Sequence, residues 1–161
     1  MLRLLLITSM LLVGSITAHA SEYKDRWSDG SAITLFDNDP DWKYAEARIE
    51  QEKKGKYVSF FLEPLNLEEK CKLRLAEEGE SKRQIFKVNG QAIQGKVACK
   101  QWVNTGGRYY IFYAVTDAGD NFIANEFKKS REVRIEHVLQ NFTLSAEGFT
   151  VEWNAQSERA L

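Results

Sequence analysis

The chain has 161 residues, 28% of them charged, and a formal net charge of −1 at pH 7. This length suits a single domain that buries a substantial core. A balance so close to neutral gives no sign of a polyanion partner, so we expect no nucleic-acid binding.

The first twenty residues have the three-part pattern of a secretory signal peptide. A basic residue is followed by a nearly continuous apolar run over residues 4–13 and by the small-x-small site Ala18-x-Ala20. The run is shorter than the roughly 20 residues that a membrane-spanning helix requires. We therefore predict a signal peptide over residues 1–20 and one exported domain over residues 21–161, periplasmic or secreted, without a membrane span.

Strand patterns dominate the first half of that domain. Residues 42–51 are ambiguous, because alternation groups Ala45, Ala47 and Ile49 whereas helical spacing groups Trp42, Ala45 and Ile49. We favour a strand, since the Lys-Gly-Lys turn that follows leads into another strand-like run. The strands expected up to the middle of the chain cover residues 32–36, 42–51 and 57–62, with a further one that begins at Cys71.

A hairpin is expected between the two cysteines. Asn89-Gly90 lies between apolar-rich arms, the typical sequence of a type I′ turn, in which both central residues need positive φ. In an oxidising compartment an isolated cysteine pair more often forms a disulfide than a metal or redox site. We therefore predict a Cys71–Cys99 disulfide, which would stabilise the fold by about 3 kcal/mol in the chain-entropy treatment.

The last third mixes strands with a helix. Residues 108–115 carry bulky apolar side chains at both parities, which predicts a central strand with both faces covered. A short helix is expected near residues 120–130, with Asp120 as its acidic cap. Further strands are expected around residues 133–135, 142–146 and 149–153. The predicted class is mainly β: an antiparallel β-sandwich or partly open barrel with one short helix and one disulfide.

Five short motifs follow one another in this last third: Asp120-Asn121-Phe122-Ile123-Ala124, Lys128-Lys129, Val133-x-Ile135, Phe142-x-Leu144-Ser145 and Gly148-Phe149-Thr150. Together they resemble the C-terminal pattern of invasion-associated locus B proteins, over about residues 109–153. That family consists of small exported bacterial proteins with a β-sandwich-like domain. The resemblance implies the same compartment and general fold, and no catalytic residue, because the family is not known for any. Its association with host cells would make the chain a virulence-associated factor.

Two motifs that suggest ion binding or catalysis are better explained structurally. Asp37-x-Asp39-x-Asp41 begins like a calcium loop, but glycine and glutamate are missing at its sixth and twelfth positions, so we expect a polar turn. His137 is the single histidine after the predicted signal peptide, and no Gly-x-Ser-x-Gly elbow accompanies it. We expect His137 to end a strand, and we expect no metal and no cofactor.

Carboxylates and aromatic residues give the remaining candidates. Glycoside hydrolysis requires two carboxylates in one cleft, one with a raised pKa; Glu46, Glu50, Glu63 and Glu126 are conceivable members, although solvated surface charge is the simpler expectation. Trp, Tyr and Arg are the residue types that most often anchor protein interfaces. The binding candidates at strand ends or turns are Trp42, Trp102, Arg108 and Tyr109, each of which core packing would also explain.

The leading hypothesis is an exported bacterial protein-binding domain without catalytic activity. An inhibitor or immunity-type partner of an envelope enzyme or toxin fits the compartment and the size, and so does a virulence-associated envelope factor. The expected partner is another protein in the cell envelope or outside the cell. The alternatives are a small carboxylate-dependent hydrolase of cell-wall glycan and a module that binds an apolar ligand.

Overall fold

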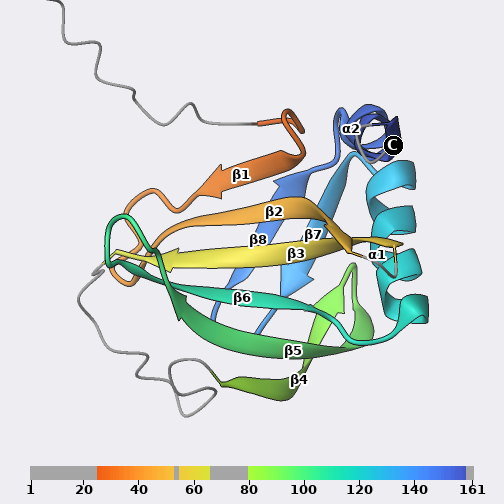
Figure 1. The fold of residues 1–161 in the computed structure, drawn as a ribbon. Helices are drawn as coiled ribbons and strands as arrows, with labels where there is room; N and C mark the ends of the chain where they lie inside the picture. The colour runs from red at the N-terminus through yellow and green to blue at the C-terminus, as the bar shows by residue number, and fades with distance from the viewer. Residues whose placement is uncertain (1–24, 53–54, 66–79, 159–161) are drawn as a thin grey trace, which may run out of the picture.

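Eight antiparallel strands curl into a nearly closed barrel in the computed structural model, which describes residues 25–52, 55–65 and 80–158 (Figure 1). The predicted class, mainly β and antiparallel, is confirmed. The strands are β1 Ser31–Leu35, β2 Trp42–Glu52, β3 Gly55–Pro64, β4 Ser81–Val88, β5 Gln91–Gln101, β6 Arg108–Ala114, β7 Glu132–Glu136 and β8 Asn141–Ser145, and the helices are α1 Asp117–Lys129 and α2 Phe149–Glu158. The order across the sheet is β1-β2-β3-β6-β5-β4-β7-β8.

Alternation along the strands divides the sheet into an inner and an outer face. In β2, Ala45, Ala47 and Ile49 belong to the core, so the strand prediction for residues 42–51 is confirmed and the helical alternative is wrong. The interior is filled largely by aromatic rings. Phe60 is completely buried and lies 5.2 Å from Phe112, centroid to centroid.

The two central strands are covered differently from what the sequence predicts. In β6 the inner residues are buried, but Tyr109, Ile111 and Tyr113 on the outer face are only partly buried. It is β3 that is buried on both faces, from Val58 through Pro64. The prediction for residues 108–115 was therefore wrong for the outer face, because none of the described strands or helices covers these side chains completely.

The Asn89-Gly90 hairpin joins β4 to β5, as predicted. Asn89 and Gly90 have φ angles of 48° and 84°. The Asn89 side chain accepts a hydrogen bond from the Arg134 backbone N–H at 2.9 Å and donates to the carboxylate of Glu126 at 2.9 Å. The turn thus has a packing role as well, because it ties the hairpin to β7 and α1.

Several predictions fall on segments outside the described residues. These are the signal peptide over residues 1–20, the strand that begins at Cys71, and one half of the predicted disulfide. Cys99 is completely buried in β5, and the described part of the chain holds no free cysteine. The Cys71–Cys99 bond therefore stays a prediction.

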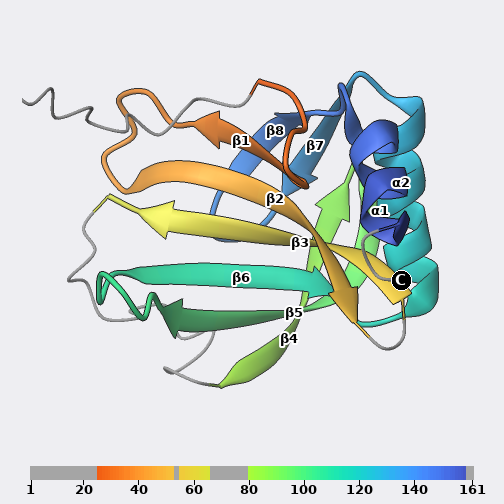
Figure 2. The same ribbon diagram turned by 45° about the horizontal axis from the view of Figure 1, so that its top comes forward.

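Both helices lie at one end of the barrel (Figures 1 and 2). Helix α1 begins three residues earlier than expected, because the side chain of Thr116, rather than that of Asp120, caps it by accepting from the Gly119 N–H at 3.1 Å. Helix α2 replaces the strand predicted over residues 149–153. Phe149 and Trp153, four residues apart, pack together at 5.3 Å while Val151 is 71% exposed, which is helical spacing.

The seam between β1 and β8 is closed by contacts other than strand pairing. At one end the Trp27 indole N–H donates to the Ser145 carbonyl at 2.9 Å, and the Trp27 backbone N–H donates to the Glu147 carbonyl at 2.8 Å. At the other end the Gln140 amide donates to the Asp39 carboxylate at 2.6 Å. Within the described ranges, no helix has the length and apolar character needed to cross a membrane.

Candidate functional site

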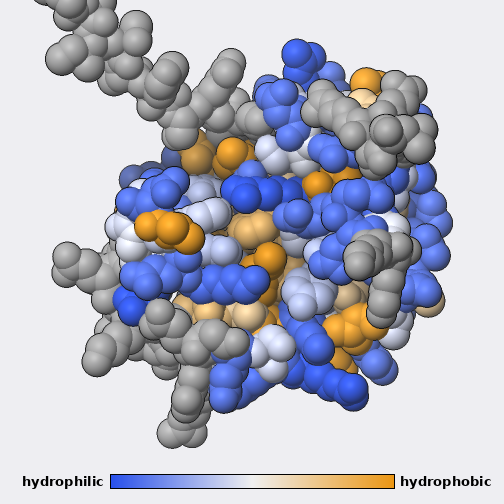
Figure 3. All heavy atoms as spheres, in the orientation of Figure 1, coloured by the Kyte–Doolittle hydropathy of each residue, from blue (hydrophilic) through white to orange (hydrophobic). Residues whose placement is uncertain are grey.

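A cluster of aromatic and charged side chains covers one end of the outer face of β2, β3, β5 and β6. We call it the outer platform and define it as Glu46, Arg48, Phe61, Trp102 and Tyr109. Figure 3 shows the surface of the molecule in the orientation of Figure 1, with hydrophobic patches between strongly hydrophilic ones. The outer face of an antiparallel sheet is usually polar, so this mixture needs an explanation.

Aromatic stacking organises the platform. The ring centroids of Trp102 and Tyr109 are 4.0 Å apart with 25° between their planes, and Phe61 lies 5.7 Å from Tyr109. Phe61 is buried, whereas Trp102 and Tyr109 are half-buried. Phe61 therefore forms the buried base of the outer platform, and the rings of Trp102 and Tyr109 keep part of their surface exposed to water.

Arg48 is fixed over these rings. Its guanidinium donates two hydrogen bonds to the Glu46 carboxylate, at 2.8 and 2.7 Å, and lies 4.3 Å from the centroid of Phe61. These hydrogen bonds raise the pKa of Arg48 further above its ordinary value, against the effect of burial. The result is a permanently charged, planar cation in one orientation.

A second buried carboxylate lies beside the platform. Glu63 is 7% exposed and accepts from Lys43 at 2.9 Å and from the Tyr44 hydroxyl at 2.8 Å. Burial and then the hydrogen bond to Glu63 hold the pKa of Tyr44 well above its usual value, so its phenol stays a donor.

The structure brings together half of the predicted binding residues. Trp102 and Tyr109 meet in the platform, but Trp42 lies in the core and packs edge-on against Tyr110 at 5.8 Å. Arg108 is half-buried, and strand alternation places it on the face opposite Tyr109. Trp42 and Arg108 are therefore not part of this surface.

The sequence analysis did not select Arg48 or Phe61. Their place follows from strand register, in which Glu46 pairs with Phe61 and β3 lies beside β6. Alternation in β2 was the one available signal, since it puts Glu46 and Arg48 on the face away from Ala45 and Ala47.

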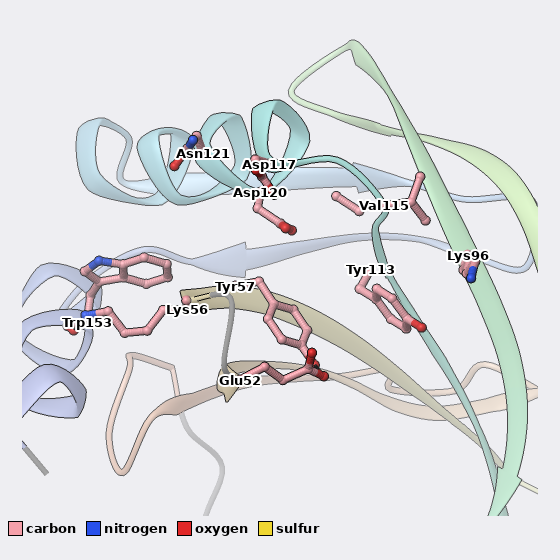
Figure 4. Close-up of a pocket in the computed structure, with 12 residues that line it drawn as sticks. Glu52, Lys56, Tyr57, Lys96, Tyr113, Val115, Asp117, Asp120, Asn121 and Trp153 are labelled. Atoms are coloured by element: carbon pink, nitrogen blue, oxygen red, sulfur yellow. Dashed lines mark hydrogen bonds between the residues drawn. The ribbon is translucent and has the colours of Figure 1, made fainter. Parts of the chain in front are cut away.

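A groove of about 580 Å³ occupies the opposite end of the same outer face, beside α1 (Figure 4). Its walls carry charged, amide and aromatic side chains from six elements rather than the apolar lining expected for a lipid-like ligand. The lining residues that bear on its chemistry are Glu52, Lys56, Tyr57, Lys96, Tyr113, Asp117, Asp120, Asn121 and Trp153.

The carboxyl of Asp120 is perturbed by its place in the groove. Burial, followed by repulsion from Asp117 and then Glu52, raises the pKa of its carboxyl to about 6. Its Oδ1 atom is buried and has no hydrogen-bond partner among the described residues. Glu52, in contrast, accepts from the Tyr57 hydroxyl at 2.9 Å.

At the α2 end of the groove, Trp153 is engaged by two lysines. The ammonium groups of Lys56 and Lys128 lie 4.7 and 5.0 Å from its ring centroid. Lys56 also donates to the Trp153 carbonyl. Burial, and then repulsion from Lys128, lowers the pKa of Lys56.

The other sequence candidates have structural roles. Three of the four candidate carboxylates, Glu46, Glu63 and Glu126, are buried and bonded rather than solvated, and Glu50 accepts from Ser59 at 3.2 Å. The simpler expectation of solvated charge was wrong for those three, because each gained a cationic or amide partner.

Asp39 and His137 complete the survey of candidates. The Asp39 carboxylate accepts from the backbone N–H groups of Asp41 and Trp42, so it stabilises a turn. His137 follows β7, stacks on Phe112 at 4.3 Å, and has its pKa lowered to about 4 by burial. In the segments that the structure describes, no three metal-ligating side chains converge on one point.

Comparison with protein-family models, with curated proteins and with solved structures found no match. The resemblance of the last third to invasion-associated locus B proteins stays a prediction.

Proposed function

We propose that the chain is an exported bacterial protein-binding domain whose partner docks on the outer platform. The observation that supports this best is the stack of Trp102 on Tyr109 at 4.0 Å beside a guanidinium held by Glu46. Trp, Tyr and Arg are the residue types in which interface binding energy concentrates. The partner is another protein of the cell envelope or the surroundings, in an inhibitor, immunity-type or virulence-associated role.

The platform is ordered before any partner arrives. The Trp102 ring stacks on Tyr109 and lies near-parallel to Phe61, and the Nε and Nη2 atoms of Arg48 each donate a short hydrogen bond to the Glu46 carboxylate. Immobilising a flexible side chain at an interface costs about 0.5–1.5 kcal/mol, so a rigid surface avoids part of that cost. This favours recognition of a folded surface over simple packing in the monomer.

The chemistry at the platform also suits binding without catalysis. The carboxylates of Glu46 and Glu63 are both occupied by donors from Arg48, Lys43 and Tyr44. Every oxygen of these two carboxylates already accepts a hydrogen bond from a neighbouring side chain, which does not suit the role of a general base. They orient cations and a phenol instead.

The test is a titration with a purified partner. The mature protein is used to capture envelope proteins, the captured protein is produced separately, and its affinity is measured by calorimetry against Trp102→Ala. Val103→Ala is the matched control, because Val103 is the neighbouring residue and is 99% exposed. We expect Trp102→Ala to weaken binding by at least about tenfold, as for an interface hot spot. Equal affinities for the two variants would contradict docking on the platform.

One observation favours the alternative of a glycan hydrolase. The groove contains Glu52, Asp117 and Asp120, and the pKa of Asp120 is raised to about 6, as a general acid would need. This alternative requires release of new reducing ends from cell-wall glycan and the loss of that release in Asp120→Asn. The apolar-ligand alternative has less support, because the groove is lined by carboxylates and lysines.

A further inference from the structure

The groove beside α1 is a second feature of the outer face that the platform does not explain. We infer that it binds an organic ammonium group, with Asp120 as the principal acceptor. The inference does not depend on the platform, since the two lie at opposite ends of the face and share no residue.

The size and composition of the groove suit a small polar ligand. Its volume of about 580 Å³ lies within the range of small-molecule sites. Figure 4 shows α1 with Asp117 and Asp120 on one side, and Tyr57 and Glu52 facing them across the space. A ligand lying between these walls would contact both.

Asp120 presents an unused acceptor. Its Oδ1 is shielded from water and accepts no hydrogen bond within the part of the chain that the structure describes, although a buried carboxylate oxygen is normally hydrogen-bonded. A donor supplied by a ligand would satisfy it. Neutral hydroxyl and charged ammonium donors both meet this requirement, so the surrounding charge must decide between them.

The surrounding charge favours a cation. Asp117 and Glu52 both repel the ionised form of Asp120, which means that the potential at this carboxyl is negative. A positive ligand is attracted by the same potential and would favour the ionised carboxylate. The charged or titratable groups around the groove are Asp117 and Asp120 on α1, Glu52 on β2, Lys56 and Tyr57 on β3, Lys96 on β5 and Tyr113 on β6.

An organic ammonium fits better than a metal ion. Among the described residues no set of three carboxylate, histidine or cysteine ligands converges as a metal site requires. The walls instead provide separated carboxylates together with the Tyr57 and Tyr113 rings, whose centroids are 5.9 Å apart. Aromatic rings and carboxylates in combination are a typical environment for ammonium groups.

The lysines set the limits of the site. Lys56 is occupied by the Trp153 carbonyl and ring, so the α2 end already holds a cation. Lys96 forms no ion pair with the described residues and lies at the other end in Figure 4. A ligand whose ammonium reaches Asp120 would therefore offer an acceptor, such as a hydroxyl or carbonyl oxygen, toward Lys96.

Two sources carry this chemistry: a lysine side chain of a protein and a free amino sugar. The probes are Nα-acetyl-lysine amide and glucosamine, each compared with its N-acetylated, uncharged counterpart, in titrations monitored by amide NMR spectra of the mature protein. We expect the charged probe from at least one source to shift amides of residues 117–121 and to bind at least about tenfold more tightly than its counterpart. The arm that binds more tightly identifies the source.

Asp120→Asn is the decisive variant, because it keeps the shape and removes the charge. We expect it to lose most of the preference for the charged probe, whereas Asp37→Asn, a matched change at an exposed site outside the groove, retains it. With an Asp120 pKa of about 6, affinity for the lysine probe should rise about tenfold from pH 5 to pH 7 in the parent protein and stay flat in Asp120→Asn. Equal binding of charged and acetylated probes, or no shift with either amine, would overturn the inference. Trp102→Ala should leave ammonium binding unchanged, so failure at one site is distinguishable from failure at the other.

Discussion

Trp27 should be one of the largest single contributors to the stability of the barrel. The side chain is 3% exposed and packs edge-on against Phe127 at 5.1 Å and Phe149 at 4.8 Å. Its indole N–H also spans the seam to the Ser145 carbonyl at 2.9 Å. It therefore connects the segment before β1 with the end of β8 and with both helices.

The expected loss can be separated into two parts. Trp27→Ala removes the packing and the hydrogen bond, and a buried tryptophan replaced by alanine costs about 3–5 kcal/mol. Trp27→Phe keeps an aromatic ring but leaves the carbonyl without its donor, for a cost of about 1–2 kcal/mol. The free energy of unfolding of a domain is typically about 5–15 kcal/mol, so the alanine variant would be markedly destabilised.

Urea unfolding followed by circular dichroism measures both losses, and Val103→Ala provides a solvent-exposed control with an expected effect within about 0.5 kcal/mol. Hydrogen exchange should show faster opening of β1 and β8 amides than of β5 and β6 amides in Trp27→Phe. A loss below about 1 kcal/mol in Trp27→Ala would refute the conclusion that this residue closes the seam.

Two further predictions concern His137 and the cysteines. His137 has a pKa of about 4 in the folded protein against 6.5 for the free side chain, so the unfolded chain takes up a proton first and stability falls as pH drops from 6.5 to 4, by up to about 3 kcal/mol. Urea unfolding at pH 7, 5.5 and 4.5 should show this fall. The His137→Phe variant, which retains stacking on Phe112, should lose less stability over the same pH range. An equal loss of stability in the variant would show that His137 is not its source. If Cys71 and Cys99 are bonded, the unfolded, unreduced mature protein will show no reactive thiol, and two reactive thiols would rule the disulfide out.

Local patterns predicted much of the fold because they reflect local requirements. Alternation over residues 42–51 identified β2, since a half-buried strand places every second side chain in the core. Asn89-Gly90 identified the hairpin, since few other residues accept positive φ at both positions. The same local analysis failed for residues 149–153, where Phe149, Val151 and Trp153 also alternate. Helix α2 forms there because Phe149 packs against Trp27 and Phe127, which lie far away in the sequence.

The candidate sites were less accessible from the sequence than the strands were. Trp102 and Tyr109 were selected by residue type and position, but the same criteria selected Trp42, which is a core residue. Residue type and position along the chain do not indicate on which face of the sheet a side chain lies once two strands are paired. Asp120 was noticed as a helix cap, but the raised pKa of its carboxyl comes first from burial in the folded protein, then from Asp117, and last from Glu52, which β2 brings near from a distant part of the chain.

By itself, the sequence determined the mainly β class, most strand positions and the presence of a helix near residues 120–130, because φ/ψ preference and side-chain alternation act within a few residues. Only the tertiary structure decided which residues share a surface. Arg48 lies over Phe61 and Trp102 because β2, β3, β6 and β5 are neighbours in one register, and the groove exists because α1 ends the barrel beside them. Strand order and register depend on contacts across the whole domain, which no local stretch of sequence encodes.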